Sequence, residues 1–263
     1  MSEQENKVDI RAVQLVMLQI MDEIDKLCQR NGLHYVLDGG TLLGAVRHKG
    51  FIPWDDDMDI LMPRDDYKRF IQLAKEQLPA GYTFQCIENT KYYPYNFGKV
   101  RATNTLFRER MTGHLPINQG IYVDVFPMDY VDVSHPHRLD YVLRWISHYT
   151  MLRYQKLKMV DKKRYQIARL IPMRFINKRI SALMEYRLNE QDNMMAKLCH
   201  QGPNKPPVSV SLFEDTILVP FENKMFRIPA AYDQYLTGRY GRDYMTPPPP
   251  DKRGTHGPVE VKI

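Results

Sequence analysis

Four aspartates within five residues lie inside an apolar segment, and this segment constrains the fold more than any other feature of the chain. Residues 50–62 read GFIPWDDDMDILM, and residues 57–62 have the length and apolar character of a buried strand. Alternate side chains of a strand share a face, so Asp57 and Asp59 are expected to point the same way, about 6.5 Å apart. The side chains expected to face the core are Met58, Ile60 and Met62. The pattern predicts a sheet that gathers carboxylates on one face.

Neighbouring carboxylates repel one another unless a cation lies between them, and oxygen ligands suit Mg²⁺ or Mn²⁺. Asp55 shares the parity of the pair and is a candidate outer ligand, whereas Asp56 faces the other way and is expected to be structural. A solvated acidic loop is disfavoured because apolar residues surround the run. An EF-hand loop is excluded because Ile60 stands where that loop requires Gly. The Asp-x-Asp motif of nucleotide-sugar glycosyltransferases remains an alternative.

A pair of glycines precedes the acidic segment. Gly39, Gly40 and Thr41 lie between a predicted strand at residues 34–37 and a predicted short helix at residues 42–47. Glycine allows close approach of the backbone, and a helix N-terminus offers free N–H groups to phosphate. A simple tight turn is the alternative interpretation. A phosphate-binding turn beside a strand with paired aspartates is the arrangement of nucleotidyltransferases, so these three residues are candidates for holding phosphate oxygens.

A third carboxylate is expected from a neighbouring strand. Residues 120–126 alternate in character and predict a strand that carries Asp124 on the face opposite Val123 and Val125. An aspartate in an apolar strand is costly unless it is paired or binds metal. Asp124 is therefore a candidate metal ligand and proton acceptor, with a buried structural Asp beside an Arg as the alternative. Asp129 is interpreted as a turn residue.

Several basic and aromatic residues are candidates for binding a donor substrate. Arg47, Lys99 and Arg101 could neutralise a transferred phosphoryl group. His48 and Lys49 are further candidates, and surface solvation is the alternative for all five. The aromatic residues that could stack on a base or enclose a quaternary ammonium are Trp54, Tyr92, Tyr93 and Tyr95, with a place in the core as the alternative.

The remaining periodicity predicts a fold of class α/β (α+β), a nucleotidyltransferase-like mixed sheet with flanking helices and a basic helical insertion or lid. Helices are expected at residues 10–31, 65–77 and 230–240, and strands at 82–88, 97–103 and as a pair within 208–228. Residues 137–198 read as mostly helical, interrupted near Pro172, and 201–207 as a linker. We expect a single domain over residues 1–263, with a catalytic core at 34–130, a basic helical region at 135–200 and a C-terminal segment at 208–253.

Positive charge is concentrated in the middle of the chain. The net charge is +6, yet residues 138–187 hold thirteen Lys and Arg against three acids, a net +10 that leaves −4 for the rest. A basic amphipathic region indicates an anionic membrane surface, and a solvated face over a helical lid is the equal alternative. No nucleic acid is expected because no binding motif is present. The three cysteines form no CxxC pair, and neither a signal peptide nor an 18-residue apolar run is apparent, so a cytoplasmic protein, peripheral rather than spanning, is expected.

The segment from Tyr35 to Ile60 resembles the signature of the LicD family. Shorter pieces resemble it too: residues 97–101, 120–127, 229–236 and 240–241. The family includes bacterial phosphocholine transferases and is related to the fukutin group of ribitol-phosphate transferases. The resemblance implies transfer of a phospho-alcohol, phosphocholine above all, from a CDP-activated donor such as CDP-choline to a hydroxyl of a glycan, with CMP as the leaving group. It also implies acceptors that are often lipid-linked, in teichoic acid, capsule or lipooligosaccharide assembly at the cytoplasmic face.

These expectations describe a metal-dependent phosphotransferase in which Asp57, Asp59 and Asp124 bind the cation. A nucleotide-sugar glycosyltransferase is the alternative enzyme, distinguished by whether phosphorus reaches the product. A glycan-binding module without activity is the alternative of another class, and it would be expected to lack one of the three aspartates, all of which are present.

Overall fold

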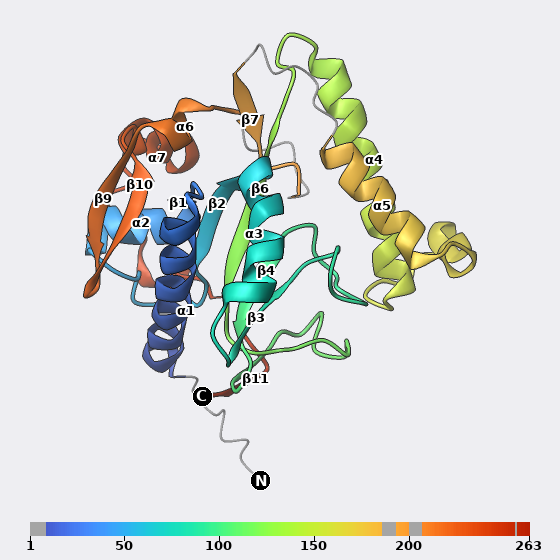
Figure 1. Cartoon of the computed structure of the whole chain (residues 1–263), viewed down its shortest axis with the longest axis horizontal. Helices are drawn as coiled ribbons and strands as arrows, with labels where there is room; N and C mark the ends of the chain where they lie inside the picture. The colour runs from blue at the N-terminus through green and yellow to red at the C-terminus, as the bar shows by residue number, and fades with distance from the viewer. Residues whose placement is uncertain (1–8, 186–192, 200–206, 256) are drawn as a thin grey trace.

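The computed structural model describes residues 9–185, 193–199, 207–255 and 257–263. A mixed sheet lies at its centre, with strand order β1-β2-β6-β4-β3 (Figure 1). Only β2 and β6 run parallel; the other neighbouring pairs along this order are antiparallel. The strands are β1 (Val36–Leu37), β2 (Asp59–Pro63), β3 (Tyr82–Gln85), β4 (Gly98–Ala102) and β6 (Tyr122–Tyr130). The predicted mixed α/β class is confirmed.

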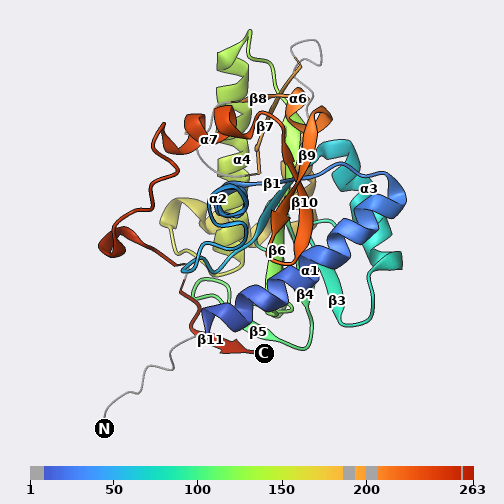
Figure 2. The same cartoon turned by 90° about the vertical axis from the view of Figure 1, so that its left-hand side faces the viewer.

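Helices α1 (Ile10–Asn31) and α3 (Arg64–Gln77) cover one face of this sheet (Figures 1 and 2). The apolar residues of α1 recur at helical spacing, and Val13, Met17 and Ile20 are fully buried. The Asp9 carboxylate caps the helix by accepting a hydrogen bond from the Ala12 N–H at 3.0 Å. Gly32 ends it in a left-handed conformation, φ 60°. The predicted helix at residues 10–31 is confirmed.

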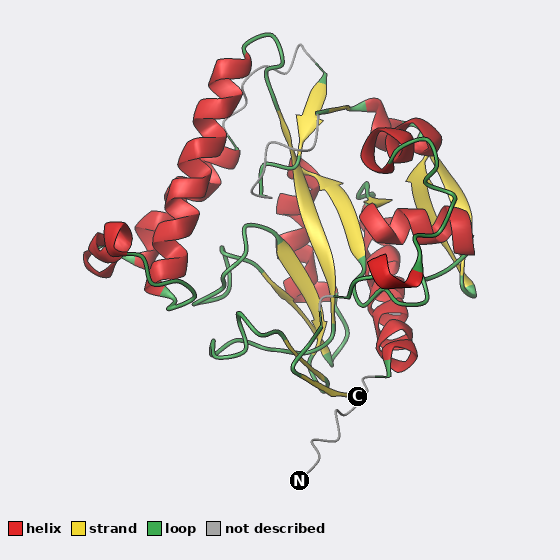
Figure 3. Cartoon of the chain, turned by 180° about the vertical axis from the view of Figure 1, so that it is seen from behind, coloured by secondary structure: helices red, strands yellow, loops and turns green. Residues whose placement is uncertain are grey.

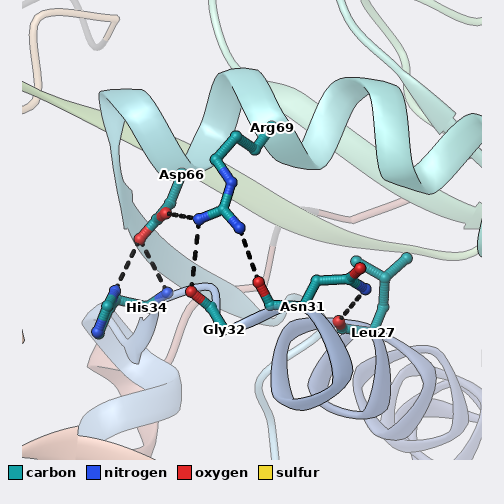
Figure 4. A network of polar contacts seen from close by, with 6 residues as sticks. All are labelled: Leu27, Asn31, Gly32, His34, Asp66 and Arg69. Carbon is teal, nitrogen blue, oxygen red and sulfur yellow. Dashed lines mark hydrogen bonds and ion pairs between the residues drawn. The ribbon is translucent and has the colours of Figure 1, made fainter.

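A polar network joins α3 to the chain between α1 and β1 (Figure 4). Asp66 accepts hydrogen bonds from the His34 main-chain N–H at 2.9 Å and from Arg69 at 3.0 Å. Arg69 also donates to the main-chain oxygen of Asn31 at 2.7 Å. These contacts hold the segment that leads from α1 into β1 against α3.

The opposite side of the sheet carries α4 (Pro136–Lys156), the 3₁₀ helix η1 (Lys163–Leu170) and α5 (Met173–Met184), which form the separate layer at the left of Figure 3. The helices break at Pro172, as predicted. Residues 194–196 were predicted to be helical, and this is wrong: they form β7 (Met194–Ala196), which extends the sheet by pairing Ala196 with Asp129 of β6. Tertiary pairing overrides local preference there. Residues 186–192 and most of the predicted linker lie outside the described residues.

The C-terminal segment folds back beside the first strands. It contains β8 (Val208–Ser209), which pairs with β7, α6 (Ser211–Glu214), the predicted strand pair β9 (Thr216–Phe221) and β10 (Lys224–Pro229), α7 (Tyr232–Tyr240), the 3₁₀ helix η3 (Pro250–Lys252) and β11 (Glu260–Lys262). Strand β11 pairs with β5 (Leu106–Arg108). The segment therefore contributes side chains next to residues far earlier in the sequence.

Asp129 is not a turn residue, contrary to prediction. Strand β6 continues to Tyr130, and Asp129 forms a buried two-point ion pair with Arg64, Nε–Oδ1 2.6 Å and Nη2–Oδ2 2.9 Å. Burial raises the pKa of Asp129, and Arg64 opposes that rise. The strand can extend because this guanidinium satisfies the carboxylate inside the protein.

Candidate active site

Three adjacent strands place charged side chains at the same level of the sheet. In the register, Asp59 of β2 pairs with Asp124 of β6, and Asp124 pairs on its other side with Lys99 of β4. Residues directly opposite one another in a sheet point to the same face. Lys99 Nζ lies 2.8 Å from Asp124 Oδ1, and both side chains are buried. Strand pairing therefore brings three residues that are distant in the sequence into one row of charged side chains.

This row opens into a cavity of about 410 Å³. Asp57, Asp59, Asp124 and Lys99 all line it, so the structure brings four of the predicted site residues together. A larger cavity of about 520 Å³ lies between α1 and β10. Its charges are paired at the surface, as in Arg11–Glu222 at 2.6 Å, so we place the active site in the smaller cavity, where several carboxylates lie close together.

The carboxylates that line the cavity shift one another's pKa values. Burial, then repulsion from Asp57 and Asp124, raises the pKa of Asp59 well above its usual value. Burial also raises the pKa of Asp124, to about 6, although Lys99 lowers it. Asp59 Oδ1 is buried and accepts no hydrogen bond from the described residues. Crowded carboxylates and an unsatisfied oxygen favour binding of a cation at this point.

The donor set fits a hard divalent cation, because every candidate ligand is a carboxylate oxygen. As they stand, no three His, Cys, Asp or Glu side chains in the described ranges converge closely enough to hold an ion. The cavity therefore contains suitable carboxylate ligands. Their side chains would have to rotate before three of them could coordinate one ion. Metal binding by Asp57, Asp59 and Asp124 stays a prediction.

The acidic segment reaches the site partly as a loop, whereas the whole of residues 57–62 was predicted to be a strand. Strand β2 begins at Asp59 rather than at residue 57, so the shared parity of a strand does not place Asp57. Asp57 lines the cavity from the loop that leads into β2. Asp56 is buried and accepts a hydrogen bond from the Gly257 N–H at 3.1 Å, as expected of a structural residue. Asp55 lies against Gly40, where a β-carbon would overlap its carboxylate.

The glycine pair forms the first turn of α2 (Gly39–His48) instead of a loop ahead of it. Gly39 has φ +57°, and a β-carbon there would lie 3.2 Å from Asp59 Oδ2, so the position favours glycine both for its backbone and for space. Thr41 is buried, and its hydroxyl accepts a hydrogen bond from the Asp59 N–H at 2.9 Å. The motif therefore places the N-terminus of α2 directly beside Asp59. Phosphate binding by Gly39, Gly40 and Thr41 stays a prediction.

The predicted basic residues lie in three different places. Lys99 lines the cavity, with its ammonium 3.2 Å from the centroid of the Tyr122 ring. Arg101 is fully buried outside the cavity lining, where Nη1 donates to the Gly120 oxygen at 2.7 Å. Arg47 donates to the Tyr244 main-chain oxygen at 2.8 Å. Donor binding by Arg47 and Arg101 stays a prediction, and only Lys99 lines the cavity.

The predicted aromatic cluster does not form as a unit. Tyr95 lines the cavity, Tyr93 is buried in the core, and Tyr92 is exposed. Trp54 packs elsewhere, with Arg253 4.2 Å from its ring centroid. The rings that do accompany Tyr95 in the cavity are those of Phe97, Tyr122, Phe126 and Tyr154.

Comparison with known proteins decides the family. The family described as "LicD/FKTN/FKRP, nucleotidyltransferase domain" matches residues 32–170, more than half of the chain. The chain belongs to the LicD family. It is 29% identical over 269 residues to the lipopolysaccharide cholinephosphotransferase LicD of Haemophilus influenzae, covering 98% of this chain and 99% of the relative.

Other relatives match only part of the chain. An uncharacterised protein of Rickettsia typhi is 39% identical over 79 residues, 30% of this chain and 25% of its own length. The human ribitol 5-phosphate transferase FKRP is 48% identical over 42 residues, 16% of this chain and 8% of its own length.

The LicD region at residues 32–170 contains the aspartates, Lys99 and a further acid that the sequence analysis missed. Glu109 lines the cavity and accepts hydrogen bonds from Tyr95 at 2.7 Å and Tyr122 at 3.3 Å. Burial opposes its ionisation, but Lys99 and the hydrogen bond from Tyr95 hold the pKa of Glu109 below its usual value. It lies in a loop with no periodicity, so no sequence signal marked it.

A second cluster lies mostly beyond the LicD region. The buried carboxylate of Asp38 pairs with Lys197 and with Arg239 at 3.2 Å, and it accepts a hydrogen bond from Tyr235 at 2.6 Å. Lys197 and Arg239 approach Asp59 from this cluster: Lys197 lowers the pKa of Asp59, and Arg239 borders the β-carbon position of Gly39. Tyr235 lies within residues 229–236, which resemble the family, but the sequence analysis did not single it out, and Lys197 fell in the region predicted to be helical.

Replacing Asp38 by Asn should destabilise the protein in a pH-dependent way. Burial opposes ionisation of Asp38, but Lys197 and Arg239 outweigh it and hold the pKa below its usual range. A depressed folded-state pKa contributes stability above the unfolded value and loses it as the pH falls. We expect Asp38→Asn to lower the free energy of unfolding by about 3–5 kcal/mol at pH 7. The difference should shrink below about pH 4, as denaturant titrations at several pH values would measure. A pH-independent difference would contradict the ion-pair account.

Proposed function

We propose that the protein transfers phosphocholine from a CDP-activated donor, CDP-choline, to a hydroxyl of a lipopolysaccharide precursor or a related surface glycan such as teichoic acid or capsule. The observation that carries the proposal is the row of Asp59, Asp124 and Lys99 across three paired strands within the LicD region. The full-length similarity to a lipopolysaccharide cholinephosphotransferase supports the choice of cargo and acceptor.

In this mechanism Asp57, Asp59 and Asp124 would hold Mg²⁺ or Mn²⁺, with Asp55 as an outer ligand. The role of the cation is electrostatic, since it would neutralise the donor diphosphate. Lys99 lines the same cavity and adds positive charge beside the transferred phosphoryl group. Gly39 to Thr41 contribute the N-terminus of α2.

The reaction is a displacement at phosphorus. The oxygen of the acceptor hydroxyl forms a bond to the phosphorus of the phosphocholine group, and the bond from that phosphorus to CMP breaks. Asp124 accepts the hydroxyl proton, and CMP leaves with the bonding electrons.

We further propose that the reaction takes place on the cytoplasmic side of the plasma membrane, with a lipid-linked acceptor. In the described ranges, no helix is both long and apolar enough to cross a bilayer. The concentration of basic residues between 138 and 187 supports a peripheral association with anionic lipid.

Removing divalent metal should abolish transfer. We expect CMP release from CDP-choline to fall to background in excess EDTA and to return when Mg²⁺ or Mn²⁺ is added back, because the crowded carboxylates need a cation to bind a diphosphate. A panel of CDP-alcohols would identify the cargo, and ³¹P NMR of the product would establish that phosphorus is transferred. Full turnover in EDTA would refute the metal mechanism. A product that gains sugar but no phosphorus would indicate a glycosyltransferase instead.

A further inference from the structure

The 3₁₀ helix η1 has one buried face and one exposed apolar face. Side chains three residues apart are aligned in such a helix. Tyr165 and Ala168 form the buried face against α4 and α5. Ile167 and Leu170 share another face and are 61% and 84% exposed. Leu170 is the most exposed large apolar side chain of the described residues, so two neighbouring branched residues lie in water with nothing covering them.

The first turn of α5 continues this apolar surface. Phe175 is 49% exposed, whereas Ile176 and Ile180 are buried toward α4. Isolated exposed apolar residues are common and need no explanation. Here three large ones fall within nine residues of sequence, at the tip where the chain turns between two packed helices. We call η1 together with the first turn of α5 the helical tip.

Basic side chains surround the apolar residues of the helical tip. Residues 156–179 hold nine Lys and Arg and one acid, a net +8. Eight of the nine basic side chains are exposed, and none of these eight forms an ion pair with another described residue. They are Lys158, Lys162, Lys163, Arg164, Arg169, Arg174, Lys178 and Arg179. Apolar side chains among exposed positive charges complement an anionic lipid surface, which offers phosphate groups above hydrocarbon.

The helical tip is fixed to the same helix that reaches the active site. Tyr154 of α4 lines the cavity, and two residues later Lys156 donates to the main-chain oxygens of Ala168 and Arg169 at 3.2 and 3.3 Å. The tip projects from the body of the protein at the right-hand edge of Figure 1, beyond α4 and α5. A surface bound there would lie at one end of a rigid helix whose last turns border the catalytic cavity.

We propose that the helical tip docks onto a bilayer surface that carries anionic lipid, with Ile167 and Leu170 entering the headgroup region and the surrounding Lys and Arg contacting lipid phosphates. The inference rests on the proposed membrane location and is independent of which group the enzyme transfers. Docking at the tip would present a lipid-linked acceptor to the cavity beside Tyr154.

Vesicle sedimentation with the full-length protein tests the proposal. We expect the protein to pellet with vesicles of phosphatidylcholine and phosphatidylglycerol, to bind pure phosphatidylcholine vesicles weakly, and to lose binding as salt rises. Leu170→Glu should weaken binding to the mixed vesicles at least about tenfold, because a charged residue replaces an inserted leucine. Leu218→Glu is the matched control, because Leu218 is a 52% exposed leucine on β9, on the opposite side of the molecule, and the charge change is identical. It should bind within about twofold of the wild type.

The possible results separate this proposal from the proposed function. If Leu170→Glu and Leu218→Glu bind the mixed vesicles equally well, insertion at the tip is overturned. Salt-sensitive binding that is unaffected by either substitution would instead show nonspecific attraction to a polyanion. Absence of pelleting by the wild type would overturn docking altogether. Asp59→Asn should pellet like the wild type while losing transfer, and Leu170→Glu should retain CMP release with a soluble acceptor. If either variant gives another transfer activity than expected, the proposed function is contradicted, but the result on membrane docking still stands.

Discussion

Asp59→Asn should reduce transfer more than about 100-fold, beyond the loss typical of a residue that only orients a metal ligand. The Oδ1 atom of Asp59 is buried and unsatisfied among the described residues, and Asp59 is paired in register with Asp124. The amide keeps the size of the side chain but cannot carry the charge that a cation and a diphosphate require. CMP release at saturating donor measures the effect. Asp140→Asn, at an exposed aspartate of α4, is the matched control and should be fully active.

The same substitution should stabilise the protein when metal is absent. Because burial and repulsion raise the pKa of Asp59 in the folded state, ionisation of this group costs stability as the pH rises from the unfolded pKa through the folded one. The melting temperature of metal-free Asp59→Asn should therefore exceed that of the wild type above about pH 4, with a gap that widens toward neutral pH. An active variant, or one that melts earlier than the wild type, would contradict the assignment of Asp59 to the cation site.

Arg64→Met should lower the free energy of unfolding by about 3–5 kcal/mol, the cost of leaving a buried charge without its partner. The Arg64 and Asp129 side chains are 7% and 2% exposed and form two short contacts between α3 and β6. Denaturant unfolding of the metal-free protein measures the loss.

Two variants make the Arg64 result specific. Arg69→Met, on the same helix at a 52% exposed side chain, should cost about 1 kcal/mol or less. The double variant Arg64→Met/Asp129→Leu should recover much of the stability, because it removes both buried charges. Equal losses for Arg64→Met and Arg69→Met would refute a special role for the buried pair.

Local spacing in the sequence was enough to predict much of the fold. The apolar repeat of residues 10–31, the turn residues around them and the helix break at Pro172 depend on contacts within a few residues, so periodicity and capping chemistry report them directly. The alternation at residues 120–126 likewise predicted that Asp124 shares a face with Tyr122 and Phe126. The acidic segment and the glycine pair were enough to indicate a carboxylate site beside a helix N-terminus.

Tertiary packing decided the rest, because strand pairing and chain return join residues that no local pattern connects. The register of β2, β6 and β4 brings Asp59, Asp124 and Lys99 into one row, and the Arg64 side chain allows β6 to continue through Asp129. The C-terminal segment supplies Arg239 to Asp38 across about two hundred residues of sequence. Hydrophobic spacing reports which side chains are buried, but the partner of a buried charge depends on which distant segments meet, and only the folded chain determines that.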